Sequence, residues 1–201
     1  MNNEVLISGE IVTEPIVTHE VFGEKFMECN VSVPRLSGVP DILPVMFSNR
    51  SLANMEFHVG DTLSATGQFR SYNKIIDGKS TLCLKVFVNE FGEVEKPNFI
   101  ALTGYLCKPV SYRTTPNGRE IADLLIAVNR AYNKSDYIPC IIWGRNARFS
   151  EMLPVGTKVS IYGRIQSREY QKRISDTEAI TKVAYEVSIN NLSIEDDSEA
   201  Q

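Results

Sequence analysis

The segment Asn3–Ile11 (NEVLISGEI) returns 95 residues later as Asn98–Leu106 (NFIALTGYL), with a glycine at the same position in both copies. A repeat of this kind determines how the rest of a chain is divided, so it is traced before secondary structure is assigned. Further matches keep a spacing of 95 or 96 residues: Val33-Pro34-Arg35 with Val128-Asn129-Arg130, 41–45 with 136–140, Val59-Gly60 with Val155-Gly156, and Gly67 with Gly163. The chain is therefore an internal duplication.

Each copy has the length of one small domain. Two copies are too few for a solenoid, so duplication of a self-sufficient fold is the better interpretation. The stretch 92–97 is charged and ends in a proline, as expected of a short linker. We therefore predict a divergent, acidic first domain over 1–96, a basic second domain over 97–194 and an acidic tip over 195–201.

Apolar residues recur in each copy with a period of two, which is typical of strands that bury one face. Gly67 and Gly163 stand in the middle of such strands, and a glycine there predicts a bulge or a sharp bend. Hairpin turns are predicted at 22–24, at Asp77-Gly78 and at Asn117-Gly118. The clearest alternating sets are Met27, Cys29, Val31 and Val33 in the first copy and Ala122, Leu124, Ile126 and Val128 in the second.

One short helical stretch is predicted in each copy, over 49–57 and over 145–153, between the third and fourth strands. Five strands with a helix at this place is the order of an OB barrel, a small closed sheet. No long parallel crossover is visible. The sequence therefore predicts an all-β protein made of two tandem OB-fold five-stranded barrels, each with one short helix between strands three and four.

The charge is distributed unevenly along the 201 residues, whose net charge is −4. Residues 1–97 contain 8 basic and 13 acidic residues, residues 98–194 contain 13 and 8, and residues 195–201 contain none and 4. The net charges of these parts are −5, +5 and −4. An anionic partner such as nucleic acid is therefore compatible with the second copy, although the whole chain is acidic.

The composition excludes several classes of protein. A hydrophobic content of 43% rules out disorder over most of the chain. The absence of a long apolar run and of a basic, apolar amino-terminal segment predicts a cytosolic protein without a membrane span. The four cysteines stand singly, at Cys29, Cys83, Cys107 and Cys140. We interpret them as buried apolar residues of a reducing compartment.

Catalysis is not expected. The sequence contains no P-loop, no GxSxG and no cluster with metal-ligand spacing. The two histidines, His19 and His58, stand apart near a turn and a predicted helix end. We therefore predict a protein that is not an enzyme and that binds no cofactor and no metal.

Motifs in the second copy point to one family through their order and spacing. They are Asn98–Leu106, Thr115-Pro116-Asn117-Gly118, Ile126-Ala127-Val128-Asn129-Arg130, 138–144 and 163–170. Together they resemble the bacterial single-stranded DNA-binding protein family. The first copy keeps the strand pattern but lacks these motifs. Its assignment as the other barrel of a two-barrel family member therefore depends on the repeat.

The resemblance implies sequence-nonspecific binding of single-stranded DNA in replication, recombination and repair. The family holds extended strands in a positive groove and stacks bases on aromatic rings. The matching positions are Tyr132, Tyr137, Trp143 and Tyr170. A ring face accepts any base, and each stack contributes about 1 to 3 kcal/mol. A place in the barrel core is the alternative for these rings, above all for Trp143, whose strand is apolar.

Basic residues of the second copy are candidates for phosphate contacts, which make binding salt-dependent. They are Arg113, Arg119, Arg130, Arg145, Arg164, Arg168, Lys172 and Arg173. Any single one is also compatible with an ordinary surface charge, so the collective excess is the stronger signal.

The first copy has weaker residues at the stacking positions: Leu36, Ile42, Phe47 or Ser48, and Tyr72. We therefore predict that it has diverged toward assembly or toward a peripheral DNA track. Its candidates for a lesser contact surface are Arg35, Arg50, Arg70, Tyr72 and Lys74.

Family members usually assemble four barrels, so the resemblance implies a homodimer of this two-barrel chain, associated with the nucleoid. It also implies that the acidic tip recruits replication or repair proteins. This tip is short and ends in Ala200-Gln201, so a solubilising terminus stays an alternative. Two other functions stay open: an assembly module of a replication complex that binds DNA weakly, and cold-shock-type RNA binding.

Overall fold

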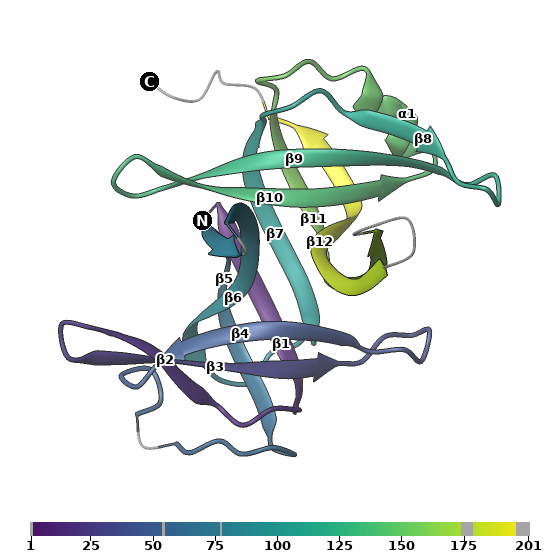
Figure 1. Ribbon diagram of the computed structural model, residues 1–201. Coiled ribbons are helices and arrows are strands. Elements are labelled where there is room, and N and C mark those ends of the chain that lie inside the picture. The colour runs from purple at the N-terminus through teal and green to yellow at the C-terminus, as the bar shows by residue number, and fades with distance from the viewer. Residues whose placement is uncertain (1, 54, 77, 174–178, 196–201) are drawn as a thin grey trace.

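The computed structural model describes residues 2–53, 55–76, 78–173 and 179–195. Over these residues the chain forms one sheet of twelve strands together with one helix, so the protein is mostly β, as predicted (Figure 1). No helix in these ranges is long and apolar enough to cross a membrane. The elements are β1 (Asn3–Ile11), β2 (Ile16–Val21), β3 (Glu24–Val33), β4 (Asp41–Ser48), β5 (Thr62–Ile76), β6 (Lys79–Phe91), β7 (Asn98–Leu106), β8 (Ser111–Thr114), β9 (Glu120–Arg130), β10 (Lys134–Trp143), α1 (Arg145–Glu151), β11 (Lys158–Arg173) and β12 (Ala179–Ile194).

Ten of the strands form two closed circuits of pairings, one in each half of the sequence. In the first half, the order β1-β3-β4-β6-β5 returns to β1. In the second half, the order β7-β9-β10-β12-β11 returns to β7 in the same way. The pairs β4–β6 and β10–β12 are parallel, and the other pairs are antiparallel. Short strands β2 and β8 lie outside the circuits and complete hairpins with β3 and β9.

The predicted period of two is confirmed by burial. Cys29, Val31 and Val33 of β3 are buried, and the residues between them are less so. The same holds for β9, where Leu124, Ile126 and Val128 are buried. Strands that present one apolar face inward leave the opposite face for solvent or ligands.

The predicted bulges lie at the two mid-strand glycines. The pairing register shifts between Thr66 and Gly67 and between Tyr162 and Gly163. A Cβ at Gly67 or Gly163 would lie 2.3 or 2.2 Å from a backbone oxygen of the neighbouring strand, so only glycine fits the close approach. The predicted hairpins are confirmed as well, although Asp77 itself lies outside the described residues.

The helix prediction is correct for the second half and wrong for the first. Helix α1 begins at the predicted residue and ends at Glu151. Residues 49–53 form turns instead, and residues 55–57 have no regular secondary structure. Ser51 donates a hydrogen bond from Oγ to the Ser48 carbonyl oxygen at 2.8 Å, and Ala53 has a φ of 53°, in the left-handed region. Local side-chain bonds and a left-handed residue favour a turn over a continuing helix.

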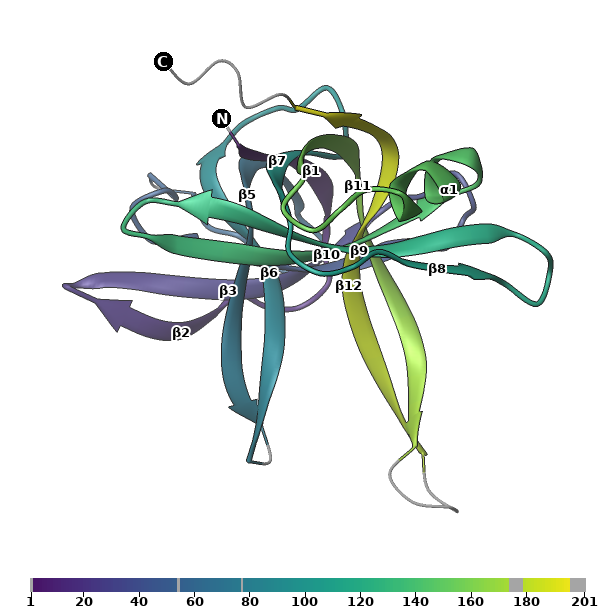
Figure 2. The same cartoon turned by 90° about the horizontal axis from the view of Figure 1, so that it is seen from above.

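The two halves are joined by strand pairing between β1 and β7, with Val5 opposite Ile100. These residues are equivalent in the repeat, so each half presents the same surface to the other, as in a two-fold dimer. Hairpins β5–β6 and β11–β12 project from the same side of the molecule (Figure 2). Each hairpin also contacts the opposite half, β5 through β10 and β11 through β4.

Candidate nucleic-acid interface

The four predicted stacking residues are all exposed. Tyr132 is 94% exposed at the turn between β9 and β10. Tyr137 and Trp143 of β10 are 46% and 41% exposed, and Tyr170 of β11 is 37% exposed. Alternation along β10 places residues 136, 138, 140 and 142 inside and the two rings outside. The alternative that Trp143 is a core residue is therefore wrong.

These rings are spread over the second half instead of forming one cluster. Tyr137 and Trp143 are six residues apart on β10, which corresponds to roughly 20 Å along a strand. Tyr170 stands on the projecting hairpin β11–β12, where Arg168 lies 5.9 Å from its ring centroid. A single strand that touches all four rings would follow an extended path across this half.

The eight predicted phosphate contacts separate into paired and available cations. Arg113 pairs with Asp123 at 2.9 Å, and Arg168 pairs with Glu186 at 3.4 Å. Arg130 and Arg164 face buried carboxylates at the junction of the halves. Exposed side chains that make no ion pair with a described residue are those of Arg119, Arg145, Lys172 and Arg173. Half of the predicted set therefore has no carboxylate partner among the described residues and could meet phosphates without breaking an ion pair with one of them.

A groove of about 640 Å³ crosses the outer face of the first half, and we call it the junction groove. Arg70, Tyr72 and Lys74 of β5 line it together with Lys85 of β6, and Arg130 of the second half completes the lining. Tyr72 is 40% exposed, and the Lys85 ammonium lies 5.1 Å from its ring centroid. A cationic, partly aromatic groove therefore exists in the half whose net charge is negative.

Lys85 was not among the predicted residues, although the sequence contains the signal. A two-residue hairpin at Asp77-Gly78 pairs Ile76 with Lys79, and continuing this register pairs Arg70 with Lys85. Opposite residues of an antiparallel pair share a face. The other first-half candidates lie elsewhere: Arg35 bonds Asp41, and Arg50 pairs with Glu24 at 3.4 Å.

A second cleft, of about 580 Å³, lies between the two projecting hairpins. Tyr72 and Lys74 line one side of it, and Tyr170, Lys172 and Lys182 line the other. It brings ring and cation candidates of both halves together, which no feature of the sequence predicted.

The first-half residues at the positions equivalent to the second-half rings differ in burial. Phe47 is buried in the core, whereas Leu36 is exposed.

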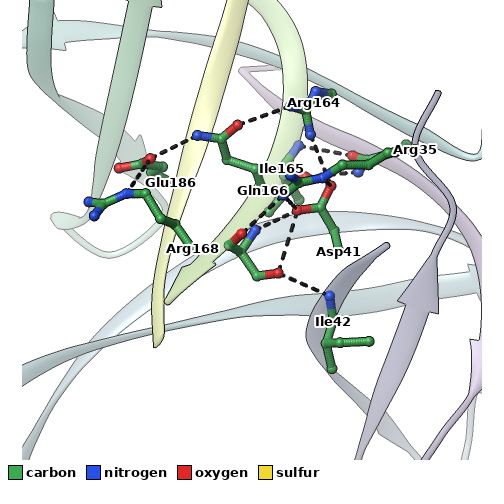
Figure 3. Close-up of polar contacts among 10 residues, drawn as sticks. Arg35, Asp41, Ile42, Arg164, Ile165, Gln166, Arg168 and Glu186 are labelled. Atoms are coloured by element: carbon green, nitrogen blue, oxygen red, sulfur yellow. Dashed lines mark hydrogen bonds and ion pairs between the residues drawn. The ribbon is translucent and has the colours of Figure 1, made fainter. Parts of the chain in front are cut away.

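Two buried aspartates hold the halves together at equivalent places. The Ser167 backbone N–H donates to Asp41 Oδ1 at 2.6 Å, and the Ile42 N–H donates to Ser167 Oγ at 3.0 Å (Figure 3). In the same way, the Ser71 N–H donates to Asp136 Oδ1 and the Tyr137 N–H donates to Ser71 Oγ, both at 2.7 Å. Each projecting hairpin is therefore fixed by a buried carboxylate of the opposite half.

Cysteines and histidines form no site in the part of the chain that the structure describes. All four cysteines are free thiols, and burial raises the pKa of Cys29 to about 12. Among the described residues, no group of three or more potential metal ligands comes together. His19 stacks on Phe26 at 4.8 Å, and His58 is an exposed neighbour of Glu14.

Comparison with known proteins relates the second half to a family. Residues 97–193 match the Single-strand binding protein family. A single-stranded DNA-binding protein of Oceanobacillus iheyensis is 34% identical over 93 residues, which are 43% of this chain and 58% of that protein. Single-stranded DNA-binding protein A of Bacillus subtilis is 32% identical over 96 residues, 44% and 56% of the two chains. The chain therefore spans little more than half the length of these relatives.

A solved structure is similar over almost the whole chain. The wild-type single-stranded DNA binding protein from Thermus aquaticus superposes with a TM-score of 0.77 at 19% identity, covering 99% of this chain and 95% of that one. A deletion mutant of the same protein gives a TM-score of 0.76, also at 19% identity, and covers 99% of this chain and 98% of that one. Both halves of this chain therefore share the fold of that protein, although the family match covers only the second.

Proposed function

We propose that this protein is a non-catalytic binder of single-stranded DNA that recognises unpaired bases by stacking and phosphates by ion pairing, without sequence preference. The observation that carries the proposal is that Tyr132, Tyr137, Trp143 and Tyr170 are all exposed in the half that matches the family. Exposed basic side chains on the same half supply the charge that a phosphate backbone needs. The names of the relatives support single-stranded DNA as the ligand.

We assign one OB-fold domain to 1–96 and one to 97–194, each built on a closed strand circuit. We further propose that two chains associate into a homodimer with four such domains and act at the nucleoid in replication, recombination and repair. The acidic tip is proposed to recruit replication or repair proteins. Apart from Glu195, its residues lie outside those that the structure describes.

The test is a titration of the full chain with oligo-dT, followed by the fluorescence of Trp143, the single tryptophan. We expect quenching, with an affinity that falls steeply as salt rises. Absence of both would refute the proposal. Light scattering with and without the oligonucleotide measures the number of chains, and oligo-U in place of oligo-dT measures the preference for DNA over RNA.

A second candidate function is an assembly module that docks to replication proteins and binds DNA poorly. The net charge of −5 on residues 1–97 favours it. Micromolar or tighter binding of oligo-dT at physiological salt would exclude this candidate, because dissolved ions at that concentration screen weak electrostatic contacts.

A further inference from the structure

Asp41 and Asp136 are equivalent in the repeat, and both side chains are fully buried between two arginines. In each case one arginine comes from the same half and one from the other. At Asp41 the bonding is complete (Figure 3). Arg35 donates to both carboxylate oxygens, and Arg164 donates from Nη1 to Oδ2 at 2.9 Å.

The cluster around Asp136 is open. Arg70 Nη1 and Arg130 Nε lie 3.7 and 3.5 Å from Asp136 Oδ2, distances too long for a good hydrogen bond. The Nε atoms of both arginines and Oδ2 itself are buried without a hydrogen-bond partner among the described residues. Because unmade bonds from buried charged donors are costly, the two guanidinium groups are poised for an additional acceptor.

The charge and the surroundings indicate which ligand fits. Two guanidinium groups against one carboxylate leave an excess positive charge. Arg70 and Arg130 are about 30% exposed and line the junction groove, so a ligand reaches them from solvent. Lys74 and Lys85 add cations to the same groove, and its one lining carboxylate, Glu28, already bonds Lys85.

In both clusters the pKa of one arginine is lowered, because it is partly buried and shares one carboxylate with a second arginine. Burial lowers the pKa of Arg70 in spite of Asp136, and the nearby Arg130 lowers it further. At Asp41, burial and the neighbouring Arg35 lower the pKa of Arg164 in the same way, whereas hydrogen bonding to Asp41 raises the pKa of Arg35. An anion placed between Arg70 and Arg130 would relieve the mutual repulsion that the single carboxylate leaves in place.

We propose that Arg70 and Arg130 together bind one phosphate group, a phosphodiester of the single strand, in the junction groove. Guanidinium groups suit this ligand because their planar donors match phosphate oxygens in pairs. Tyr72, in the same groove, offers a ring to the adjacent base. Asp136 lies between the two guanidinium groups and competes with the phosphate for them. The inference rests on the proposed function, and it makes the phosphate site a joint product of the two halves.

The test compares oligo-dT binding of the full-length wild type with that of Arg70→Gln, Arg130→Gln and Arg148→Gln over a range of salt concentrations. We expect each of the first two substitutions to weaken binding about tenfold, as for loss of a charged hydrogen bond. Arg148→Gln is the matched control, because this exposed arginine pairs with Glu120 and does not line the groove. It should leave the affinity unchanged.

Two further variants separate binding from folding. The triple variant Arg70→Gln, Arg130→Gln, Asp136→Asn removes all three charges at similar side-chain size, so no buried charge is left unpaired. Its slope of log affinity against log salt should fall by about 0.7, the value for one phosphate of a single strand. Asp136→Asn alone should tighten binding, because it removes the competing carboxylate. If the two arginines serve only to neutralise Asp136, Asp136→Asn should not increase the affinity for oligo-dT.

The outcomes distinguish the two proposals. A wild type that fails to bind oligo-dT at any salt refutes the proposed function itself. A wild type that binds, with a triple variant of equal affinity and equal salt slope, overturns the phosphate site alone. Inorganic phosphate that raises the melting temperature of the wild type but not of the triple variant, with equal oligo-dT affinities, would assign the site to a free phosphate and overturn the strand assignment.

Discussion

The two halves build the same strand circuit but arrange their charged side chains differently. The second half has the positive sequence, yet Arg113, Arg164 and Arg168 are engaged by carboxylates. The first half has the negative sequence, yet its Arg70 and Lys85, although they face Asp136 and Glu28, also line the junction groove. The net charge of a segment therefore does not locate an anion site, because pairing and topology decide which cations stay available.

The largest effect is expected from the aromatic residues, and it tests whether the second half carries the main contact. Tyr132→Ala with Tyr170→Ala should weaken oligo-dT binding by about 2 to 6 kcal/mol, because each stack contributes about 1 to 3. Tyr72→Ala in the first half should cost about 1 to 3 kcal/mol. Fluorescence titration at fixed salt measures both. Tyr162→Ala, which removes another exposed ring, is the control. A larger loss from Tyr72→Ala than from the double variant would move the main contact to the first half.

The second prediction compares the two buried aspartates through stability. Asp41→Asn should lower the free energy of unfolding by about 3 kcal/mol, because breaking a buried, hydrogen-bonded ion pair is strongly destabilising. Asp136→Asn should cost about 1 kcal/mol, since its arginines make no short bonds to it. Urea unfolding of both full-length variants gives the values. Equal losses would mean that the two clusters are energetically alike.

The third prediction tests whether the two circuits close in the same way. A Cβ at Gly9 would lie 2.3 Å from the Ser32 carbonyl oxygen, and one at Gly104 would lie 2.4 Å from that of Ala127. Gly9→Ala and Gly104→Ala should therefore each lower the free energy of unfolding by about 2 kcal/mol, as overpacking does. The reference is Gly92→Ala, where a Cβ meets nothing within 4 Å. If only one of the two glycines proved sensitive, the closures would differ.

The smallest effect is expected from exposed ion pairs, one in each half. Arg113→Gln removes the pair with Asp123, and Arg50→Gln removes the pair with Glu24. Each should change the free energy of unfolding by less than about 1 kcal/mol, because water screens such pairs. Thermal unfolding at low and high salt measures the difference. A loss well above this limit at Arg113 would show that its pair with Asp123 has a structural role.

Much of the fold could be predicted because its signals are local in the sequence. The repeat indicated the two halves, the period of two indicated the buried faces, and Gly67 and Gly163 indicated the bulges. The helix predicted over 49–57 does not form, because turn-forming contacts at Ser48 and Ser51 prevail. Exposure of Tyr137 and Trp143 agrees with the alternation along β10, and for Trp143 it excludes the alternative of a core position.

The state of the predicted arginines could not be predicted. Arg164 was expected to meet phosphate, but its carboxylate partner, Asp41, is 123 positions away in the chain. Arg130 and Arg70 come from different halves and meet only because each hairpin contacts the opposite half. The spacing of residues within one copy does not show which arginine meets which carboxylate of the other copy. Pairing between distant residues depends on the register of β1 against β7, which only the folded chain defines.

The sequence by itself determined two copies of an all-β unit, the alternation that buries one face of each strand, and the rings and cations that face outward. These properties are local, since a residue's side of a strand depends on its neighbours. The tertiary structure decided which of those cations are neutralised and where the free ones gather. That choice depends on the docking of one half against the other, because a carboxylate and an arginine interact strongly only when the fold brings them together and excludes water.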